Sequence, residues 1–472
     1  NRLLVWDIKF EKLLPDLAEK WSGSSDGKEY TFNLRKGVKW HDGQPFTAAD
    51  VEFSFQRLLD KRTTSPRGTY LASLKGADDY ASNKTDKLPG VTVVDDATVK
   101  LTLDSPSGPF LAGLAALSIL PKHLLGEVAP DQLAKHDYFQ NGFVGTGPFK
   151  LTKHVPDQFM ETAANPDYYA GKPKLDRVVI RKITAPGAAE LALEKGEVDF
   201  TSLTSDEKDR VAALPTLTTI GTTALVFNGL SINLKKPGLD DKRVRQAFLL
   251  AIDRKGIVDK IMKGSGRVVN NPILVPWVQA TDLNTYDYNP DKAKAMLQEA
   301  KWDTGRELEL SYYYADQVSR NIVTAIQQQL GQVGVKITQI RQLETPAFNQ
   351  KVYQANDFDV AYVGHGGGEP NDYLRYFHSQ YPYPKGFNYT SYKNPKIDDL
   401  FEKGRNAVDP EARKPTYLEI ERILNDELPI LPLWEPIRYA GHTKRLQSFV
   451  WTAVSGLYGM AYQDDREKWA LA

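Results

Sequence analysis

The sequence predicts an α/β protein that is divided into more than one lobe. Its 472 residues are too many for one hydrophobic core, since domains average about 150 residues, and the length indicates roughly three domains or sub-domains. Strand-like and helix-like segments alternate in the second half of the chain. Turn signals recur throughout, so the whole chain is expected to fold.

The amino-terminal third has the pattern of a small α+β unit. Asp26-Gly27 is a turn signal, and strand-type residues follow from Tyr30 to Leu34. Thr47 stands three residues before Asp50, which is a capping-box spacing, and the apolar residues after it recur at helical intervals. Two further short strands are expected in this unit: 91–94 and 98–103.

The middle of the chain contains three helix signals. Residues 187–200 predict a helix that Gly196 stops, followed by a short buried strand. Val244 and Phe248 lie on one face of a second predicted helix. Asn289-Pro290 predicts the start of a third helix, because asparagine is favoured at the cap and proline at the first helical position.

Alternating units after residue 306 predict a mostly parallel sheet with right-handed crossovers. The expected order is strand, helix, strand, helix and strand: 308–314, 317–333, 335–340, 347–353 and 358–363. Two helices, 395–405 and 410–424, then lead to an apolar strand at 430–434.

Composition argues against several functional classes. Lys plus Arg equals Asp plus Glu at 60 each, so no long-range field attracts polyanions, and nucleic acid is not an expected partner. The most apolar run, 110–120, is about half as long as a bilayer requires. Cysteine is absent, which removes disulfides and thiolate catalysis. The seven histidines show no metal-binding spacing, so no metal or other cofactor is expected.

A glycine-rich segment after the strand at 358–363 is the first candidate site. Ligands of open α/β sheets lie outside the carboxyl ends of the strands, and glycines there expose backbone amides. The bland alternative is an ordinary surface loop. The candidate ligand-binding residues of the segment are Gly364, His365, Gly366, Gly367, Gly368, Glu369, Asn371 and Asp372.

A serine hydrolase is the competing interpretation. His365 to Gly368 spells HGGG, an oxyanion-hole motif, and residues 23–27 match the G-x-S-x-G nucleophile pattern around Ser25. A nucleophile elbow joins a strand to a helix, whereas Ser25 lies in a polar turn before a predicted strand. In that hydrolase fold the HGGG loop precedes the nucleophile along the chain, whereas here it follows residues 23–27. We therefore predict no catalytic residues.

Several long segments resemble a single protein family. Residues 14–60, 145–151 and 231–254 are similar to the extracytoplasmic solute-binding proteins of family 5, the peptide, nickel and oligosaccharide class that feeds ABC importers. The resemblance implies a two-lobed periplasmic-binding-protein (Venus flytrap) fold with an additional peripheral α+β domain. It begins inside the family's amino-terminal region, so about forty further residues of the family pattern are expected before Asn1.

The resemblance also implies a division of the chain. Residues 1–144 are expected to form the peripheral domain, residues 145–232 with 437–472 the first ligand-binding lobe, and residues 233–436 the second. The two lobes would close on a solute and present it to a permease driven by ATPase subunits. The implied protein is a monomer in the periplasm or another extracytoplasmic space, and it meets the membrane through the transporter or a lipid anchor.

The ligand class stays open at this point. Peptide-binding members carry an aspartate for the peptide's ammonium group, and either alignment register places a glycine there, Gly366 or Gly368. Glu369, Asp372 or Glu435 are the alternative ammonium partners. A peptide therefore competes with an oligosaccharide, an opine-like conjugate and a metal chelate. The resemblance and the aromatic pattern add five candidate ligand-binding residues: Phe227, Asn228, Trp434, Glu435 and Trp451.

Overall fold

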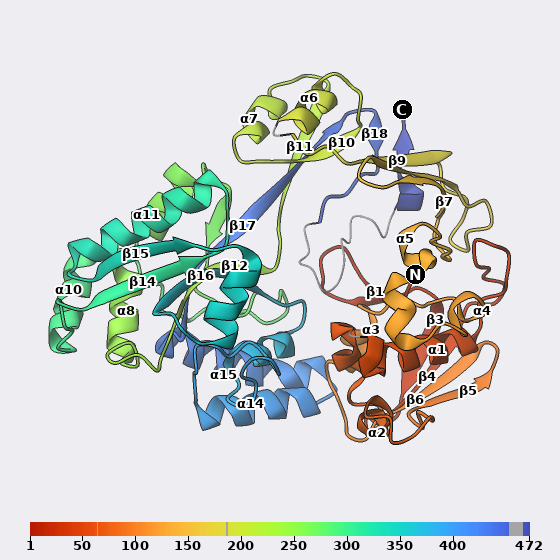
Figure 1. The fold of residues 1–472 in the computed structure, drawn as a ribbon, viewed down its shortest axis with the longest axis horizontal. Coiled ribbons are helices and arrows are strands. Elements are labelled where there is room, and N and C mark those ends of the chain that lie inside the picture. Colours follow the sequence, from red (N-terminus) through yellow and green to blue (C-terminus); the bar gives the residue numbers. More distant parts are fainter. Residues whose placement is uncertain (64, 186, 453–465) are drawn as a thin grey trace.

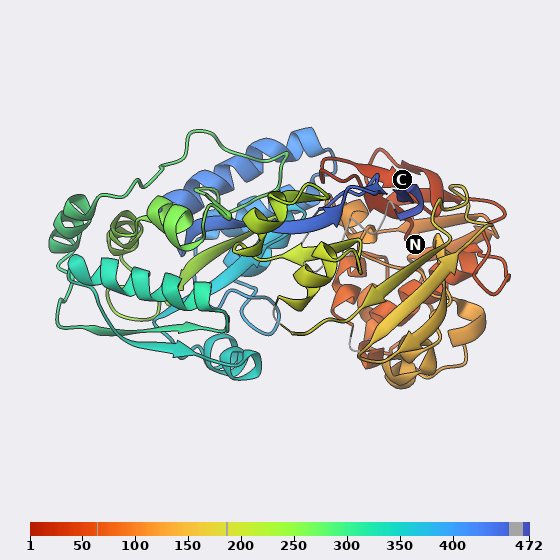
Figure 2. The same ribbon diagram turned by 90° about the horizontal axis from the view of Figure 1, so that it is seen from above.

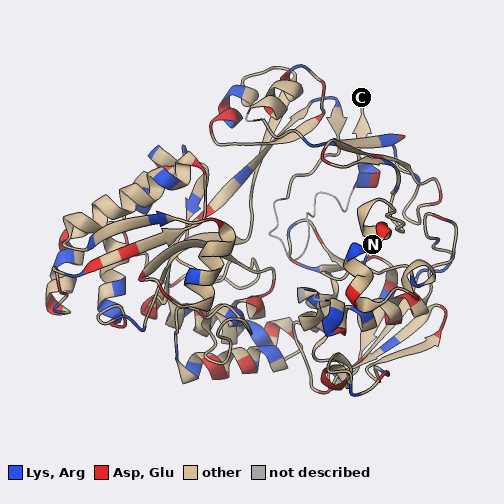
Figure 3. Ribbon diagram, viewed as in Figure 1, with Lys and Arg blue, Asp and Glu red and all other residues tan. Residues whose placement is uncertain are grey.

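The computed structural model describes residues 1–63, 65–185, 187–452 and 466–472. Figure 1 shows two large bodies of chain, and Figure 2 shows the same separation from above. Strands β1–β9 lie in one body, whereas β14–β16 and the longest helices lie in the other. Acidic and basic residues are mixed over both bodies (Figure 3), as the balanced composition predicts.

The amino-terminal body contains a four-stranded antiparallel sheet covered by helix α1 (Ala48–Leu59). The strands follow the order β3 (Ala18–Gly23), β4 (Glu29–Leu34), β6 (Thr98–Thr102) and β5 (Val91–Asp95). The predicted capping box is confirmed, because Thr47 and Asp50 make both of its hydrogen bonds. The predicted strands of this unit are confirmed as well.

A three-stranded sheet follows in the same body. Its strands are β7 (Phe149–Val155), β8 (Phe159–Ala164) and β9 (Arg177–Arg181). His41 fixes the chain as it enters β7: its backbone N–H donates to the carbonyl of Gly145 at 2.8 Å, and its Nδ1 accepts from the N–H of Gly145 at 3.1 Å. The two sheets are thereby tied together.

The largest sheet has eight strands and is mixed, so the prediction of a mostly parallel sheet is wrong. Only β14 lies parallel to its neighbours, β15 and β16. The other pairs are antiparallel, because β12 runs opposite to β16 and β17, and β17 runs opposite to β10, β11 and β13. The strands are β10 (Phe200–Leu203), β11 (Leu217–Thr223), β12 (Val226–Ile232), β13 (Gly266–Val268), β14 (Glu307–Tyr312), β15 (Lys336–Gln342), β16 (Val360–Gly366) and β17 (Ile430–Thr443).

Strand β17 connects the two bodies. Sequence predicts its end at Trp434, but the strand is 14 residues long and ends at Thr443. Its first part pairs with β12, up to Trp434, and its second part pairs with β11 from Ile437 onward. Figure 1 shows β17 running from β12 and β16 toward β10 and β11 at the top of the view.

The helices around the large sheet agree with most of the sequence predictions. They include α8 (Lys242–Ala251), α10 (Pro290–Glu299), α11 (Gln317–Gln332), α14 (Pro395–Asn406) and α15 (Pro410–Glu427). The cap at α10 is confirmed, because Asn289 accepts from the N–H of Lys292 at 2.9 Å. The helix expected at 347–353 is instead a short α12 (Thr345–Phe348) followed by a π-helical turn, η5 (Asn349–Gln354).

The remaining elements are short. The helices and turns are η1 (Lys61–Thr63), η2 (Pro66–Leu71), α2 (Ala77–Ala81), α3 (Phe110–Leu114), α4 (Lys122–Leu125), η3 (Pro130–Lys135), α5 (Asp137–Gln140), α6 (Ala188–Glu194), α7 (Glu207–Ala212), α9 (Arg254–Gly256), η4 (Ile257–Ile261), η6 (Pro370–Tyr373), α13 (Leu374–Phe377) and η8 (Arg466–Lys468). The strands are β1 (Leu4–Trp6), β2 (Leu13–Pro15), β18 (Leu446–Gln447) and β19 (Ala470–Leu471). No helix in the described part of the chain has the length and apolarity to cross a bilayer.

Candidate functional site

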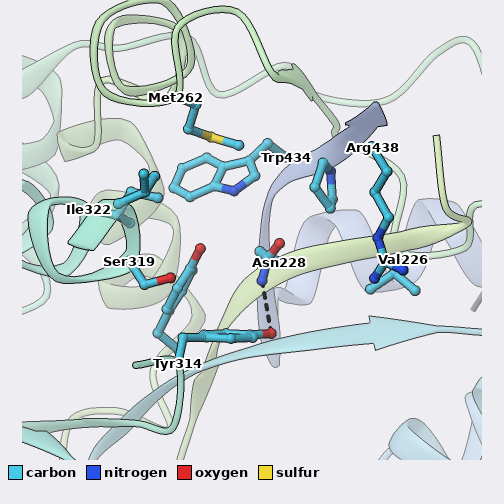
Figure 4. Close-up of a pocket in the computed structure, with 11 residues that line it drawn as sticks. Val226, Asn228, Met262, Tyr314, Ser319, Ile322, Trp434 and Arg438 are labelled. Carbon is cyan, nitrogen blue, oxygen red and sulfur yellow. Dashed lines mark hydrogen bonds between the residues drawn. The ribbon is translucent and has the colours of Figure 1, made fainter. Parts of the chain in front are cut away.

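A pocket of about 250 Å³ lies on the large sheet, beside the point where β17 changes partner from β12 to β11. Three strands, the start of α11 and the segment after η4 supply its walls (Figure 4). The lining residues are Val226, Asn228, Met262, Tyr314, Val318, Ser319, Ile322, Tyr362, Trp434, Pro436 and Arg438. Two of these, Asn228 and Trp434, are candidates from the sequence.

One wall of the pocket is aromatic. The ring of Tyr314 lies 5.5 Å from that of Tyr362, which in turn lies 6.1 Å from the indole of Trp434. Asn228 donates its amide to the Tyr314 hydroxyl at 3.1 Å (Figure 4), which fixes both side chains. Burial raises the pKa of both tyrosines well above its usual value, so both stay neutral. This wall suits an apolar or ring-shaped part of a solute.

Trp434 serves both the core and the pocket. Its side chain is fully buried and packs with the main hydrophobic cluster of the large body. Figure 4 shows its indole beneath the Met262 side chain, at one side of the pocket. Trp434 therefore supports the wall of the pocket from within the core.

Arg438 is the one charged side chain among the residues that line the pocket. It lies beyond the point where β17 changes partners, and it is exposed. Within the described residues its guanidinium forms no ion pair. Its carbonyl accepts a hydrogen bond from Trp451 Nε1 at 3.1 Å, so Trp451, also predicted from sequence, lies beside this end of the site.

The glycine-rich segment is not the open loop that its sequence predicts. Gly364, His365 and Gly366 belong to β16, where Gly366 pairs with Val226 of β12. A Cβ atom on Gly366 would lie 2.6 Å from the carbonyl oxygen of Leu225. A Cβ atom on Gly367 would lie 2.6 Å from the Cβ of Asp372, and Gly368 is also buried. Glycine is required here because neighbouring chain segments approach closely.

In the register that places Gly366 at the aspartate position, this crowding leaves no room for that side chain, and it predicts a loss of stability on substitution. Gly366→Ala should lower the free energy of unfolding by about 1–3 kcal/mol, since the new methyl group meets a backbone carbonyl that has little room to move. Urea unfolding followed by tryptophan fluorescence measures the change. Gly331→Ala is the matched control, because a Cβ there meets nothing within 4 Å. Equal stabilities of the two variants would contradict the steric explanation.

His365 and Phe227 lie in the core and not in the pocket. The His365 side chain is 1% exposed, and its Nε2 shares hydrogen bonds with Ser231 Oγ at 3.1 Å and Tyr389 OH at 2.9 Å. Burial lowers the pKa of His365 to about 3, so the ring is neutral. Its ring stacks on Phe227, which faces away from the pocket because side chains alternate along β12. The structure does not bring these two candidates to the site.

Glu369 and Asn371 belong to a buried polar network. Glu369 is 2% exposed, forms an ion pair with Arg413 and accepts from the N–H of Asn371 at 2.6 Å. The Asn371 side-chain oxygen accepts from the Tyr417 hydroxyl at 3.2 Å. The Glu369 carboxylate is therefore neutralised from inside its own lobe and is not available to a ligand ammonium group.

The other two predicted ammonium partners are also engaged. Asp372 accepts from the backbone N–H groups of Gly368 at 3.0 Å and Glu369 at 3.1 Å. Glu435 is fully buried and bound by Arg267 at 2.6 Å, and it accepts from the N–H of Leu225 at 3.2 Å. The structure thus assigns an internal partner to each carboxylate that sequence proposed.

The two hydrolase motifs do not form a catalytic site. Ser25 lies in the exposed turn between β3 and β4, where Ser24 Oγ bonds to Asp26 at 2.5 Å. His365 lies in the buried strand β16 of a different sheet. Among the described residues there is also no group of three or more His, Asp or Glu side chains placed to hold a metal ion. Ser25 and His365, the two motif residues, therefore belong to separate sheets and do not form a nucleophile–base pair.

Sequence reasoning missed most of the pocket. Tyr314 lies just beyond the carboxyl end of β14, so the rule applied to the glycine segment applies equally to it. Met262 and Ser319 carry no motif. Arg438 was overlooked because β17 was predicted to end four residues earlier, at Trp434.

Two bodies joined by strands that pass between them, with an aromatic pocket at the junction, define a solute-binding protein. Residues 12–386 match the bacterial extracellular solute-binding proteins, family 5 (middle region). The chain belongs to this family. The predicted family and the two-lobed α/β fold are therefore confirmed.

Individual relatives agree. The dipeptide-binding protein of Escherichia coli is 30% identical, over 93% of this chain and 84% of its own length. The structure of the Listeria monocytogenes ABC transporter substrate-binding protein CtaP has a TM-score of 0.85 and 26% identity, and the match covers 99% of this chain and 92% of CtaP. The oligopeptide-binding protein AppA of Bacillus subtilis, solved with a nonapeptide, has a TM-score of 0.80 and 27% identity, with coverage of 100% and 92%.

These relationships establish the general role of the chain. It is the substrate-binding component of an ABC importer, and it works outside the cytoplasm. Its partners in transport are a solute, a membrane permease and the ATPase subunits that drive the permease.

Proposed function

We propose that the chain binds a peptide or another polar organic solute in the pocket beside Trp434 and encloses it between the two lobes. The observation that carries this proposal is the position of the pocket on β17, the strand that pairs with β12 up to Trp434 and with β11 from Ile437 onward. A rotation about these strands changes the surroundings of the pocket more than those of any site within one lobe. A solute that binds the closed form more tightly than the open form then drives closure.

The relatives support a peptide, since one is a dipeptide-binding protein and another was solved with a nonapeptide. The lining of the pocket is also compatible with the other ligands considered from the sequence, because tyrosine and tryptophan rings suit a sugar, an opine-like conjugate or a metal chelate. In this proposal Asn228, Trp434 and Trp451 contact the solute. The glycine segment from Gly364 to Gly368 supports the pocket from behind.

The proposal retains the division predicted from sequence. Residues 1–144 form the peripheral domain, 145–232 with 437–472 one lobe, and 233–436 the other. The protein acts as a monomer, meets the membrane only through the transporter or a lipid anchor, and has no catalytic activity of its own.

Solute-induced closure is the test of this function. We expect the radius of gyration, measured by small-angle scattering, to fall when the protein meets a mixture that contains its solute. Tyr314→Ala removes one ring of the aromatic wall and should weaken binding by roughly 10- to 100-fold. Tyr288→Ala, at a side chain that is 44% exposed, is the control and should bind normally.

Peptide, sugar and metabolite mixtures should each be tried, and bound molecules identified by mass spectrometry after denaturation. Compaction with the peptide mixture alone would select the peptide alternative. The proposal fails if no mixture compacts the protein and no small molecule is retained.

A further inference from the structure

We infer that the solute carries an anionic group, a carboxylate or a similar oxyanion, that Arg438 binds, and that the solute needs no free ammonium group. This inference rests on the proposed function, because it assigns the chemistry of the same pocket. It rests on three features of the site: the single charge of its lining, the engagement of the nearby carboxylates, and the position of Arg438 on β17.

The first feature is the charge of the lining. Arg438 is its one charged side chain, and within the described part of the chain the guanidinium has no acidic partner. A guanidinium offers five N–H donors in a planar fork that matches a carboxylate in a bidentate geometry. Figure 4 shows the Arg438 side chain extending past Val226 at the edge of the pocket. An anion there would meet an unused cation.

The second feature is the state of the carboxylates. Glu369, Asp372 and Glu435 are held by Arg413, by backbone N–H groups and by Arg267, respectively. A buried ammonium group without a carboxylate partner is strongly disfavoured. None of these three side chains lines the pocket, so none is placed to pair with an ammonium group there.

Asp316 is a further carboxylate close to the pocket. It caps helix α11, where its two oxygens accept from the N–H of Ser319 at 2.7 Å and from the Ser319 hydroxyl at 2.8 Å. These two hydrogen bonds hold the carboxylate against the helix end, in a cap that contributes roughly 1 kcal/mol to the stability of a helix. Asp316 does not line the pocket, so the charge that the lining itself presents is that of Arg438.

The third feature is the position of Arg438 beyond the change of partners in β17. Trp434, four positions earlier, pairs with β12 in the large body, whereas Arg438 pairs with Thr222 of β11. A solute that packs on Trp434 and binds Arg438 thus contacts strand segments on both sides of the junction. Its anionic group is then a contact whose strength depends on the angle between the lobes, which is the property that couples binding to closure.

The test compares chemically modified mixtures of solutes. A cell extract is divided into three portions: one untreated, one with its carboxylates converted to methyl esters, and one with its amines acetylated. The protein is incubated with each portion, washed and denatured, and the released molecules are identified by mass spectrometry. We expect retention from the untreated and the acetylated portions and none from the esterified portion.

Variants locate the anion. Arg438→Ala should weaken binding of the identified solute by roughly 10- to 100-fold, as expected for the loss of a charge-assisted pair, and Arg438→Lys should restore part of the affinity. Arg177→Ala removes an exposed arginine of β9 and leaves binding unchanged. Both arginines are exposed, so the folded state is expected to survive each change.

Retention that survives esterification but not acetylation would overturn the inference, and so would equal affinities of Arg438→Ala and Arg177→Ala. In both cases the protein still binds a solute, so the proposed function stands. A wild-type protein that retains nothing from the untreated extract would instead refute the proposed function, and this inference with it.

Discussion

Glu369→Ala is expected to lower the free energy of unfolding by about 3–5 kcal/mol, because it leaves the cation of Arg413 buried without its counter-ion. The two side chains are only 3% and 4% exposed. After the substitution the hydrogen bonds that Arg413 retains go to two neutral groups, the carbonyl of Gly404 and the hydroxyl of Tyr417, each at 2.9 Å. Urea unfolding measures the loss.

The matched control is an exposed ion pair on the same helix, α15. Arg422 and Asp282 are 49% and 58% exposed, so Asp282→Ala should cost less than about 1 kcal/mol. The double variant Glu369→Ala/Arg413→Leu should recover much of the stability that the single variant loses, since no charge then stays buried. A loss for Glu369→Ala no larger than that of the control would contradict this account.

Glu421 is expected to make the protein less stable as the pH rises from about 4.5 to 8. Its side chain is fully buried, and burial raises its pKa from 4.5 to about 8, although the N–H of Ala280 donates to it at 2.6 Å. The folded state therefore binds a proton that the unfolded state releases in this range. The stabilisation is complete below pH 4.5 and is lost as the pH rises through the folded pKa, by as much as about 5 kcal/mol.

Glu421→Gln provides the measurement, because glutamine resembles the protonated acid at every pH. The variant should match the wild type near pH 4.5 and exceed its free energy of unfolding above pH 8. Glu419 lies at an exposed site of the same helix and pairs with Lys396. Glu419→Gln should leave unchanged the difference between the free energies of unfolding at pH 4.5 and pH 8. If the free energy of unfolding of Glu421→Gln depends on pH in the same way as that of the wild type, Glu421 is not a protonated buried carboxyl.

Local signals in the sequence predicted local structure well. The cap at Thr47, the cap at Asn289 and the helices α14 and α15 all depend on residues within one turn of each other. Such features need no information about distant parts of the chain. The long segments that resemble the solute-binding family supplied the arrangement that local signals leave undetermined.

The errors have one physical origin, which is pairing between segments distant in sequence. Glycines from Gly364 to Gly366 predict a loop when read alone, but β12 lies beside them and makes them a strand. The same strand approaches too closely for an aspartate at Gly366. Arg438 was not predicted as a site residue, because β17 extends beyond Trp434 by pairing with β11, which lies more than two hundred residues earlier in the chain.

Pro436 stands where β17 leaves one partner and joins the next. Trp434 is matched with Asn228 before it, and Ile437 is matched with Thr223 after it. Because proline has no N–H, its place in the strand has no backbone donor that needs an acceptor. The next donor, the N–H of Ile437, binds the carbonyl of Ser265 at 3.1 Å, and Pro436 itself is matched with Gly266 of β13. A third strand therefore holds β17 at the point where its main partner changes.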